Sequence, residues 1–169
     1  MEIEEEKLIR YIEQAFQSVA YPGDENIVDN PEHCPECIEL YEFLKGKHWK
    51  DIINMLSINP LLLIKYYDKF PLLTQKAKLF YLPLYLISVI KIVNILRLTD
   101  NSLYFIEDLS RVMVDFIVYC LSDVNCLNYN ILNRSQKRSI LIFLDYIQQQ
   151  LTEEDPLKKD IIKIKKYLK

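Results

Sequence analysis

A chain of 169 residues with 50% hydrophobic and 27% charged residues has the composition of one globular domain, 1–169, and is too apolar for a disordered protein. Only two glycines are present, which argues against an all-β fold because hairpin turns and bulges use glycine freely. The net charge of -3 gives no overall positive field, so we predict no nucleic-acid partner.

The first predicted element is a helix over residues 3–19, where apolar residues recur at steps of three and four. A cluster of glutamates at its start complements the helix dipole. The helix should end before Pro22 and Gly23, because proline restricts the preceding residue and glycine adopts backbone conformations that a side chain forbids. A polar loop is predicted to continue to about residue 33.

Short helices are predicted next. Pro35 and Glu36 suit the first turn of a helix that ends near Gly46, which is well placed as a left-handed cap. A further helix is predicted over 49–56, and the apolar run 61–64 is also assigned to a helix, although it is short.

A long central helix is predicted from an N-cap at Thr74 to about Leu98. Pro83 should kink it, because proline lacks an amide proton and its ring crowds the carbonyl one turn earlier. Lys91 and Arg97 interrupt the apolar stretch, and a charge at bilayer depth is costly. We therefore predict a buried helix and no membrane partner.

The remaining sequence predicts three more helical features. Residues 100–102 offer a cap for a helix whose apolar face runs over 103–120, Asn133 or Ser135 caps the next helix, and Pro156 opens the last one. No repeat at a fixed period indicates a solenoid. The predicted fold is all-α: a single irregular multi-helix bundle with a polar loop at about 20–33 and a Pro-kinked central helix.

The N-terminus is acidic and lacks a basic segment followed by an apolar run, so a secretory signal is not indicated. We therefore predict a cytoplasmic location, where cysteines are kept reduced.

The pattern His33-Cys34-Pro35-Glu36-Cys37 is the sharpest chemical signal. Two thiols separated by two residues at a helix start can bind one metal ion, such as zinc with His33, Cys34 and Cys37 as ligands, but this is half of a structural zinc site. The same spacing permits a redox pair, because a helix N-terminus favours the thiolate. Packing of two small side chains is the third reading.

A hydrolase would use Cys34 as nucleophile, His33 as base and Asp24 to orient the base. Adjacent side chains diverge at a helix start, so this arrangement is disfavoured, and no complete catalytic set is apparent. We therefore do not predict an enzyme.

Four motifs together resemble an uncharacterised bacterial domain family, a domain of unknown function. They are Tyr-Pro-Gly-Asp-x-Asn-Ile at 21–27, Cys-x-Glu-Cys at 34–37, Gly-Lys-x-Trp-x-Asp-Ile at 46–52 and Tyr-Leu-Pro at 81–83. The resemblance covers about the first half of the chain, and Gln75 departs from it, since the family has proline there. It implies a shared fold and a shared surface, but no activity.

The function predicted from the sequence is an accessory or protein-interaction module, including an inhibitor or immunity-type protein. Its candidate functional surface consists of Tyr21, Asp24, Asn26, Glu36 and Trp49. The alternative is a metal- or thiol-dependent site at His33, Cys34 and Cys37, with a small cysteine hydrolase as a further alternative. The sequence does not indicate the oligomeric state.

Overall fold

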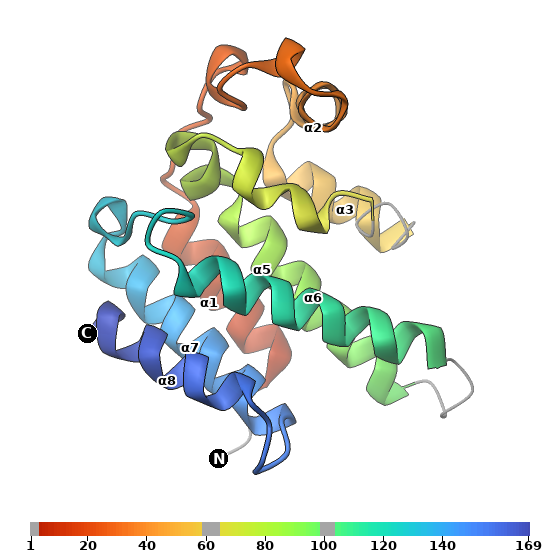
Figure 1. Cartoon of the computed structure of the whole chain (residues 1–169), viewed down its shortest axis with the longest axis vertical. Helices are drawn as coiled ribbons and strands as arrows, with labels where there is room; N and C mark the ends of the chain where they lie inside the picture. The colour runs from red at the N-terminus through yellow and green to blue at the C-terminus, as the bar shows by residue number, and fades with distance from the viewer. Residues whose placement is uncertain (1–3, 59–64, 99–103) are drawn as a thin grey trace. The chain divides into compact units, whose positions relative to one another are not determined.

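The computed structural model describes residues 4–58, 65–98 and 104–169 (Figure 1). Across these ranges the regular elements are helical, and the only extended pairing is an isolated antiparallel bridge between Val28 and Leu73. The predicted all-α fold is therefore confirmed. No helix within these ranges is both long and apolar enough to cross a membrane.

The chain divides into two compact units, one formed by Met1–Ser18 with Val89–Lys169 and the other by Val19–Ser88. The single domain predicted from chain length stays a prediction. The candidate site lies in the second of these units, which we call the site unit. Its elements are η1 (Asp24–Asn26), η2 (Pro31–His33), α2 (Pro35–Leu44), α3 (Trp49–Ile58), η3 (Tyr67–Leu72) and the first part of α5 (Gln75–Leu98).

Aromatic side chains form much of the core of the site unit. Trp49, Phe70 and Phe80 are each 0% exposed, and Tyr81 is equally buried. Phe80 contacts Tyr81 edge to face, with ring centroids 4.9 Å apart. Phe80 and Tyr81 both belong to α5. The loops of this unit therefore pack against the first part of α5.

The other unit packs helices that are distant in the sequence as well as the neighbouring pair α7 and α8. Its elements are α1 (Glu5–Phe16), the rest of α5, α6 (Tyr104–Ser122), η4 (Tyr129–Ile131), α7 (Arg134–Gln150) and α8 (Leu157–Leu168). α7 lies against both α1 and α8, and α8 also packs on α6 (Figure 1). Tyr146 in α7 donates a hydrogen bond of 2.8 Å to Glu5 and thereby joins α7 to the first turn of α1.

Local signals placed most helix starts correctly. Thr74 caps α5 by accepting a hydrogen bond of 3.1 Å from the amide of Ala77. Asn133, rather than Ser135, caps α7 in a capping box with Gln136, and α8 starts directly after Pro156. Gly46 has a φ of +66°, which confirms its left-handed conformation after α2.

Other predictions differ from the structure or lie outside it. The first helix, Glu5–Phe16, ends three residues before the predicted end at 19, residue 3 lies outside the described residues, and η3 was not predicted. Pro83 lies inside α5 as expected, while the kink stays a prediction. The predicted loop at 20–33 contains two short 3-10 turns. The segments 61–64 and 100–102 lie outside the described residues.

Candidate functional site

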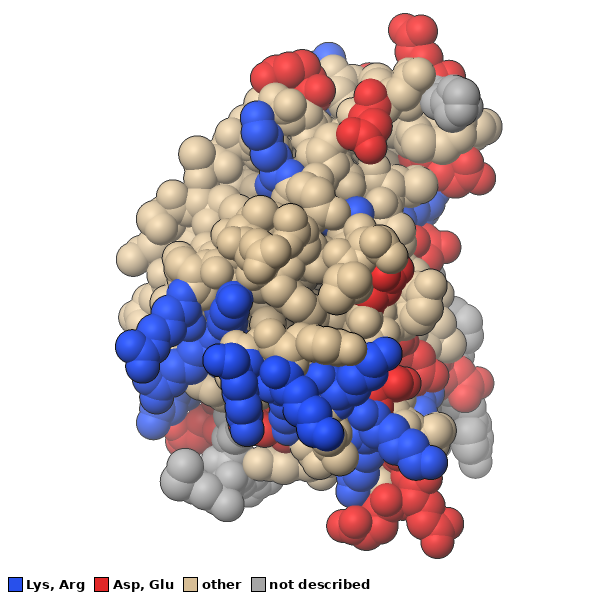
Figure 2. All heavy atoms as spheres, turned by 60° about the vertical axis from the view of Figure 1, so that its left-hand side comes forward, with Lys and Arg blue, Asp and Glu red and all other residues tan. Residues whose placement is uncertain are grey.

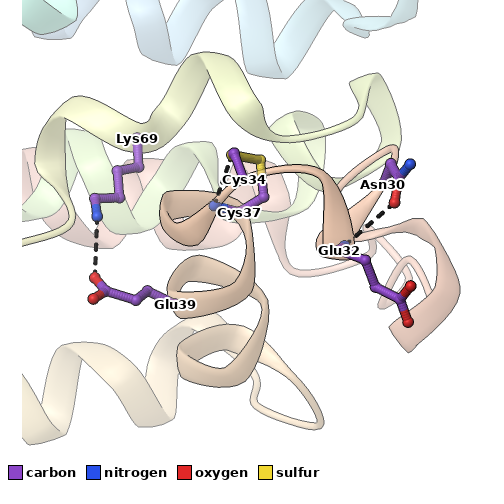
Figure 3. Close-up of a disulfide and its surroundings, with 6 residues drawn as sticks. All are labelled: Asn30, Glu32, Cys34, Cys37, Glu39 and Lys69. Atoms are coloured by element: carbon purple, nitrogen blue, oxygen red, sulfur yellow. Dashed lines mark hydrogen bonds and ion pairs between the residues drawn. A yellow bond between two sulfur atoms is a disulfide. The ribbon is translucent and has the colours of Figure 1, made fainter.

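The start of α2 carries a disulfide between Cys34 and Cys37 (Figure 3). Cys34 is the N-cap residue with extended backbone, and Pro35 occupies the first helical turn, where its missing amide proton costs nothing. This geometry brings the two Cα atoms to 5.2 Å, and the amide of Cys37 lies 3.1 Å from the sulfur of Cys34. Both cysteines are half-buried.

We expected reduced thiols, and the structure joins this pair instead. The reason is local: three residues of helix start place the two side chains within bonding reach. Cys120 and Cys126 are both buried.

A short turn directs the chain into this helix start. The side chain of Asn30 accepts a hydrogen bond of 3.3 Å from the amide of Glu32, and Pro31 opens η2 (Figure 3). The backbone of His33 belongs to η2, but its side chain lies outside the described part of the structure.

One side of α2 is bound to the segment around η3. Glu39 forms an ion pair with Lys69 at 3.3 Å (Figure 3). It also pairs with Lys65 at 3.5 Å, and the hydrogen bond from Lys69 is the main cause that lowers the pKa of Glu39. Phe43 stacks on Tyr66 with ring centroids 3.9 Å apart. These contacts fix the orientation of α2 without using its cysteines.

Tyr21 and Asp24 meet at the end of α2. The hydroxyl of Tyr21 donates to the carboxylate of Asp24, and the amide of Gly46 lies 2.8 Å from the Tyr21 hydroxyl and 3.1 Å from the Asp24 oxygen. The hydrogen bond from Tyr21 lowers the pKa of Asp24, whereas burial, followed by Asp24, raises the pKa of Tyr21. A cysteine hydrolase would use Asp24 to orient His33. In the structure the Asp24 carboxylate instead binds Tyr21 and the backbone of the turn at Gly46.

Asn26 also serves the local structure. Its side-chain amide donates 2.9 Å to the carbonyl of Pro22, and its own carbonyl accepts a hydrogen bond from the hydroxyl of Thr74. The amide of Thr74 binds the carbonyl of Ile27 at 3.0 Å, next to the bridge between Val28 and Leu73. The polar loop is thus pinned to the start of α5.

Trp49 lies in the core rather than on a surface. Its ring is 0% exposed and lies beside His48, which in turn contacts Phe80 edge to face at 5.0 Å. The hydroxyl of Tyr81 lies 3.0 Å from the carbonyl oxygens of both Leu44 and Lys47, and burial raises its pKa. This aromatic layer supports the turn between α2 and α3.

His48 caps α3 in a way that depends on its protonation. Its Nδ1 accepts a hydrogen bond of 3.1 Å from the amide of Lys50, which requires that nitrogen to be unprotonated. Burial is the main cause that lowers the pKa of His48 below its ordinary value of 6.5; the charge of Lys50 acts in the same direction, and Asp51 opposes it.

We expect His48 to make stability depend on pH. The His48 side chain is protonated at a higher pH in the unfolded chain than in the folded chain. The stabilisation by the His48 cap is therefore complete above about pH 6.5 and is lost as the pH falls through the lowered pKa of the folded state. Urea unfolding of the wild type and His48→Asn at pH 7.5 and 5.5 tests this, since asparagine caps helices without titrating. Equal losses of stability in both proteins on acidification would contradict the assignment.

The sequence-predicted site residues thus separate into groups. Tyr21 and Asp24 come together with Gly46, while Asn26 acts within its own loop and Trp49 is buried. Glu36 is exposed on α2. The sequence analysis did not single out Lys65, Tyr66 and Lys69, because their contacts with α2 bridge more than 20 residues of chain and have no local signature.

A metal centre finds no ready ligand set here. Across the part of the chain that the structure describes, no group of three or more His, Cys, Asp or Glu side chains could hold a metal ion. Cys34 and Cys37 would have to be reduced before either could bind zinc. Zinc binding with His33 stays a prediction.

No protein-family model, curated protein or solved structure matches this chain in the comparisons with known proteins. The resemblance to an uncharacterised bacterial domain family therefore stays a prediction.

Proposed function

We propose that Cys34 and Cys37 form a reversible dithiol–disulfide pair at the start of α2. The observation that carries this proposal is the disulfide itself, which links two half-buried residues at a helix N-terminus. Both sulfurs belong to one short turn, so the bond can open and close without separating distant parts of the chain. A cytoplasmic location, which we also propose, would expose the pair to thiol reductants.

Reduction of the pair takes two exchange steps. A thiolate of an external dithiol attacks Cys37, a mixed disulfide forms, the Cys34–Cys37 bond breaks, and Cys34 leaves as a thiolate. The second external thiolate then attacks the mixed disulfide and releases Cys37, so the reductant becomes a disulfide and two electrons pass to the protein. The released thiolates exchange protons with solvent.

The local geometry distinguishes the two sulfurs. The sulfur of Cys34 faces the amide of Cys37 at 3.1 Å and lies at the positive end of the helix dipole. Both features favour the thiolate of Cys34. Cys34 is therefore the better leaving group during reduction and the more reactive thiol of the reduced protein.

Two variants, each lacking one cysteine of the pair, test this asymmetry. We expect the reduced Cys37→Ser variant, which keeps Cys34, to react with a small aromatic disulfide at pH 7 at least about tenfold faster than Cys34→Ser. Cys126→Ser is the control, because Cys126 is buried outside this site. The wild type should release two equivalents of aromatic thiol for each Cys34–Cys37 bond formed. Equal slow rates in both variants would contradict the proposal.

A second candidate function is protein binding through the outward face of α2. Leu40 and Leu44 point into the core, whereas Ile38 is 47% exposed and lies one helical turn before the exposed Glu42. Of the surface predicted from the sequence, Asp24 and Asn26 bind other residues of the site unit and Trp49 is buried, whereas Glu36 on α2 is exposed. An exposed apolar residue beside an acidic one fits a basic protein surface with an apolar pocket.

Site-specific photocrosslinking in the native cell tests this second candidate. A photoreactive residue at Ile38 should capture a discrete protein that the same residue at Met55 does not, although Met55 is also an exposed apolar side chain at 40%. Identical products at both positions, or none at position 38, would contradict binding through this face.

A further inference from the structure

The outward face of α8 carries a continuous stripe of lysines. Lys159, Lys163 and Lys166 follow one another at steps of four and three residues, so they lie on one side of the helix, and all three are exposed. The opposite side is buried against the unit through Leu157, Ile161, Ile164 and Leu168. The three lysines therefore lie on the solvent-facing side of α8.

The neighbouring helix widens this positive surface. α7 packs beside α8, and its first turns carry the exposed residues Arg134 and Arg138 and the half-buried Lys137. Figure 2, which turns the α7 and α8 side of Figure 1 toward the viewer, shows Lys and Arg side chains gathered in a band. We define the basic face as Arg134, Lys137, Arg138, Lys159, Lys163 and Lys166.

Ion pairing divides the cations of α8 into two groups. Lys158 pairs with Glu153 at 3.4 Å and Lys165 pairs with Asp145 at 2.6 Å. Among the described residues, none of the six cations of the basic face has a carboxylate partner, and the exposed carboxylate on α8 is Asp160. Like charges one helical turn apart repel each other, so the basic face is left with positive charge that an external anion would relieve.

We propose that the basic face adsorbs to an anionic phospholipid surface. Ile162 is 47% exposed and Tyr167 is 51% exposed, and the helical positions of these two residues flank the lysine stripe on either side. Lysines interspersed with an aliphatic side chain and a tyrosine suit the headgroup region, where tyrosine is enriched and lysine meets lipid phosphates. The expectation of no membrane partner rested on the absence of a spanning segment, and adsorption requires none.

The apolar neighbours favour lipid over nucleic acid. A nucleic-acid backbone would be bound by the cations alone, whereas a membrane surface also accepts Ile162 and Tyr167. The apolar side of α8 is already used in the unit, so binding would be superficial and sensitive to salt, because screening acts over about 10 Å at 0.1 M. Each cation should add about fivefold to the affinity at low salt.

Vesicle sedimentation with the full chain tests the proposal. The wild type should bind vesicles in which phosphatidylserine makes up roughly a third of the lipid, but not vesicles of phosphatidylcholine alone. The variant Lys159→Glu/Lys163→Glu/Lys166→Glu should lose at least about 100-fold in binding at low salt, since three cations each contribute about fivefold. Its control is Lys45→Glu/Lys50→Glu/Lys76→Glu, which changes the net charge equally at exposed positions of the site unit.

Circular dichroism and urea unfolding of both triple variants establish that they remain folded. Raising the salt to about 1 M should release the wild type from the vesicles, since the screening length then falls to about 3 Å. Absence of binding to the anionic vesicles at low salt would overturn the proposal. So would equal losses in the two triple variants, or tighter binding to duplex DNA than to vesicles at the same salt.

Discussion

Replacing Phe80 by alanine is expected to lower the free energy of unfolding by about 3–5 kcal/mol, the usual cost of emptying a buried phenylalanine position. Phe80 is 0% exposed and makes edge-to-face contacts with Tyr21, His48 and Tyr81. Its removal therefore opens a cavity beneath both the loop that holds Asp24 and the cap of α3. Urea unfolding followed by circular dichroism measures the loss.

Phe80→Leu is the matched control, because it keeps most of the volume and should cost roughly 1–2 kcal/mol. If Phe80→Ala loses no more than Phe80→Leu, the aromatic layer does not support the site unit in the way the contacts indicate.

Replacing Asp155 by alanine should destabilise the other unit by about 2 kcal/mol, because three charge-assisted or capping hydrogen bonds disappear together. The side chain of Asp155 is 7% exposed, binds the guanidinium of Arg111 with both oxygens, and accepts a hydrogen bond of 3.0 Å from the amide of Leu157. It thereby joins α6 to the first turn of α8. Asp115→Ala is the control, since Asp115 binds the same arginine at the surface and should cost well under 1 kcal/mol.

The same carboxylate should make stability depend on acid pH. The hydrogen bond from Arg111 is the main cause that holds the pKa of Asp155 below its ordinary value of 3.8, and the backbone amide and nearby positive charges act in the same direction. Its contribution is therefore present above about pH 4 and is lost as pH falls through the lowered folded pKa. The difference in stability between wild type and Asp155→Ala should shrink between pH 5 and pH 2; a constant difference would contradict this assignment.

The helices could be predicted because their signals are local. Apolar residues at steps of three and four and caps such as Thr74 and Asn133 lie within the segments that they specify. η3 was missed because Pro71 and a mixed apolar pattern give no clear period over six residues.

The candidate site could be predicted only in part, because its contacts join distant residues. The sequence placed Cys34 and Cys37 within bonding reach, since that depends on three residues of chain, but the spacing is equally compatible with thiols or a metal. The partners of Asp24 and Asn26 could not be predicted, because Gly46 and Thr74 lie 22 and 48 residues away. The lysines of the last helix were visible in the sequence, but their position beside the basic turns of α7 follows from the packing of two helices.

The redox equilibrium of Cys34 and Cys37 in the full chain tests most directly whether they form a reversible dithiol–disulfide pair. Protein is equilibrated in glutathione buffers of graded potential, free thiols are alkylated, and mass spectrometry gives the fraction with a disulfide. We expect one two-electron transition within the range of cellular thiol buffers, about −320 to −180 mV, while Cys126 is alkylated only after unfolding. If Cys34 and Cys37 are both found alkylated even after equilibration in the most oxidising buffer, they have stayed reduced. That result would show that the pair does not function as a reversible disulfide.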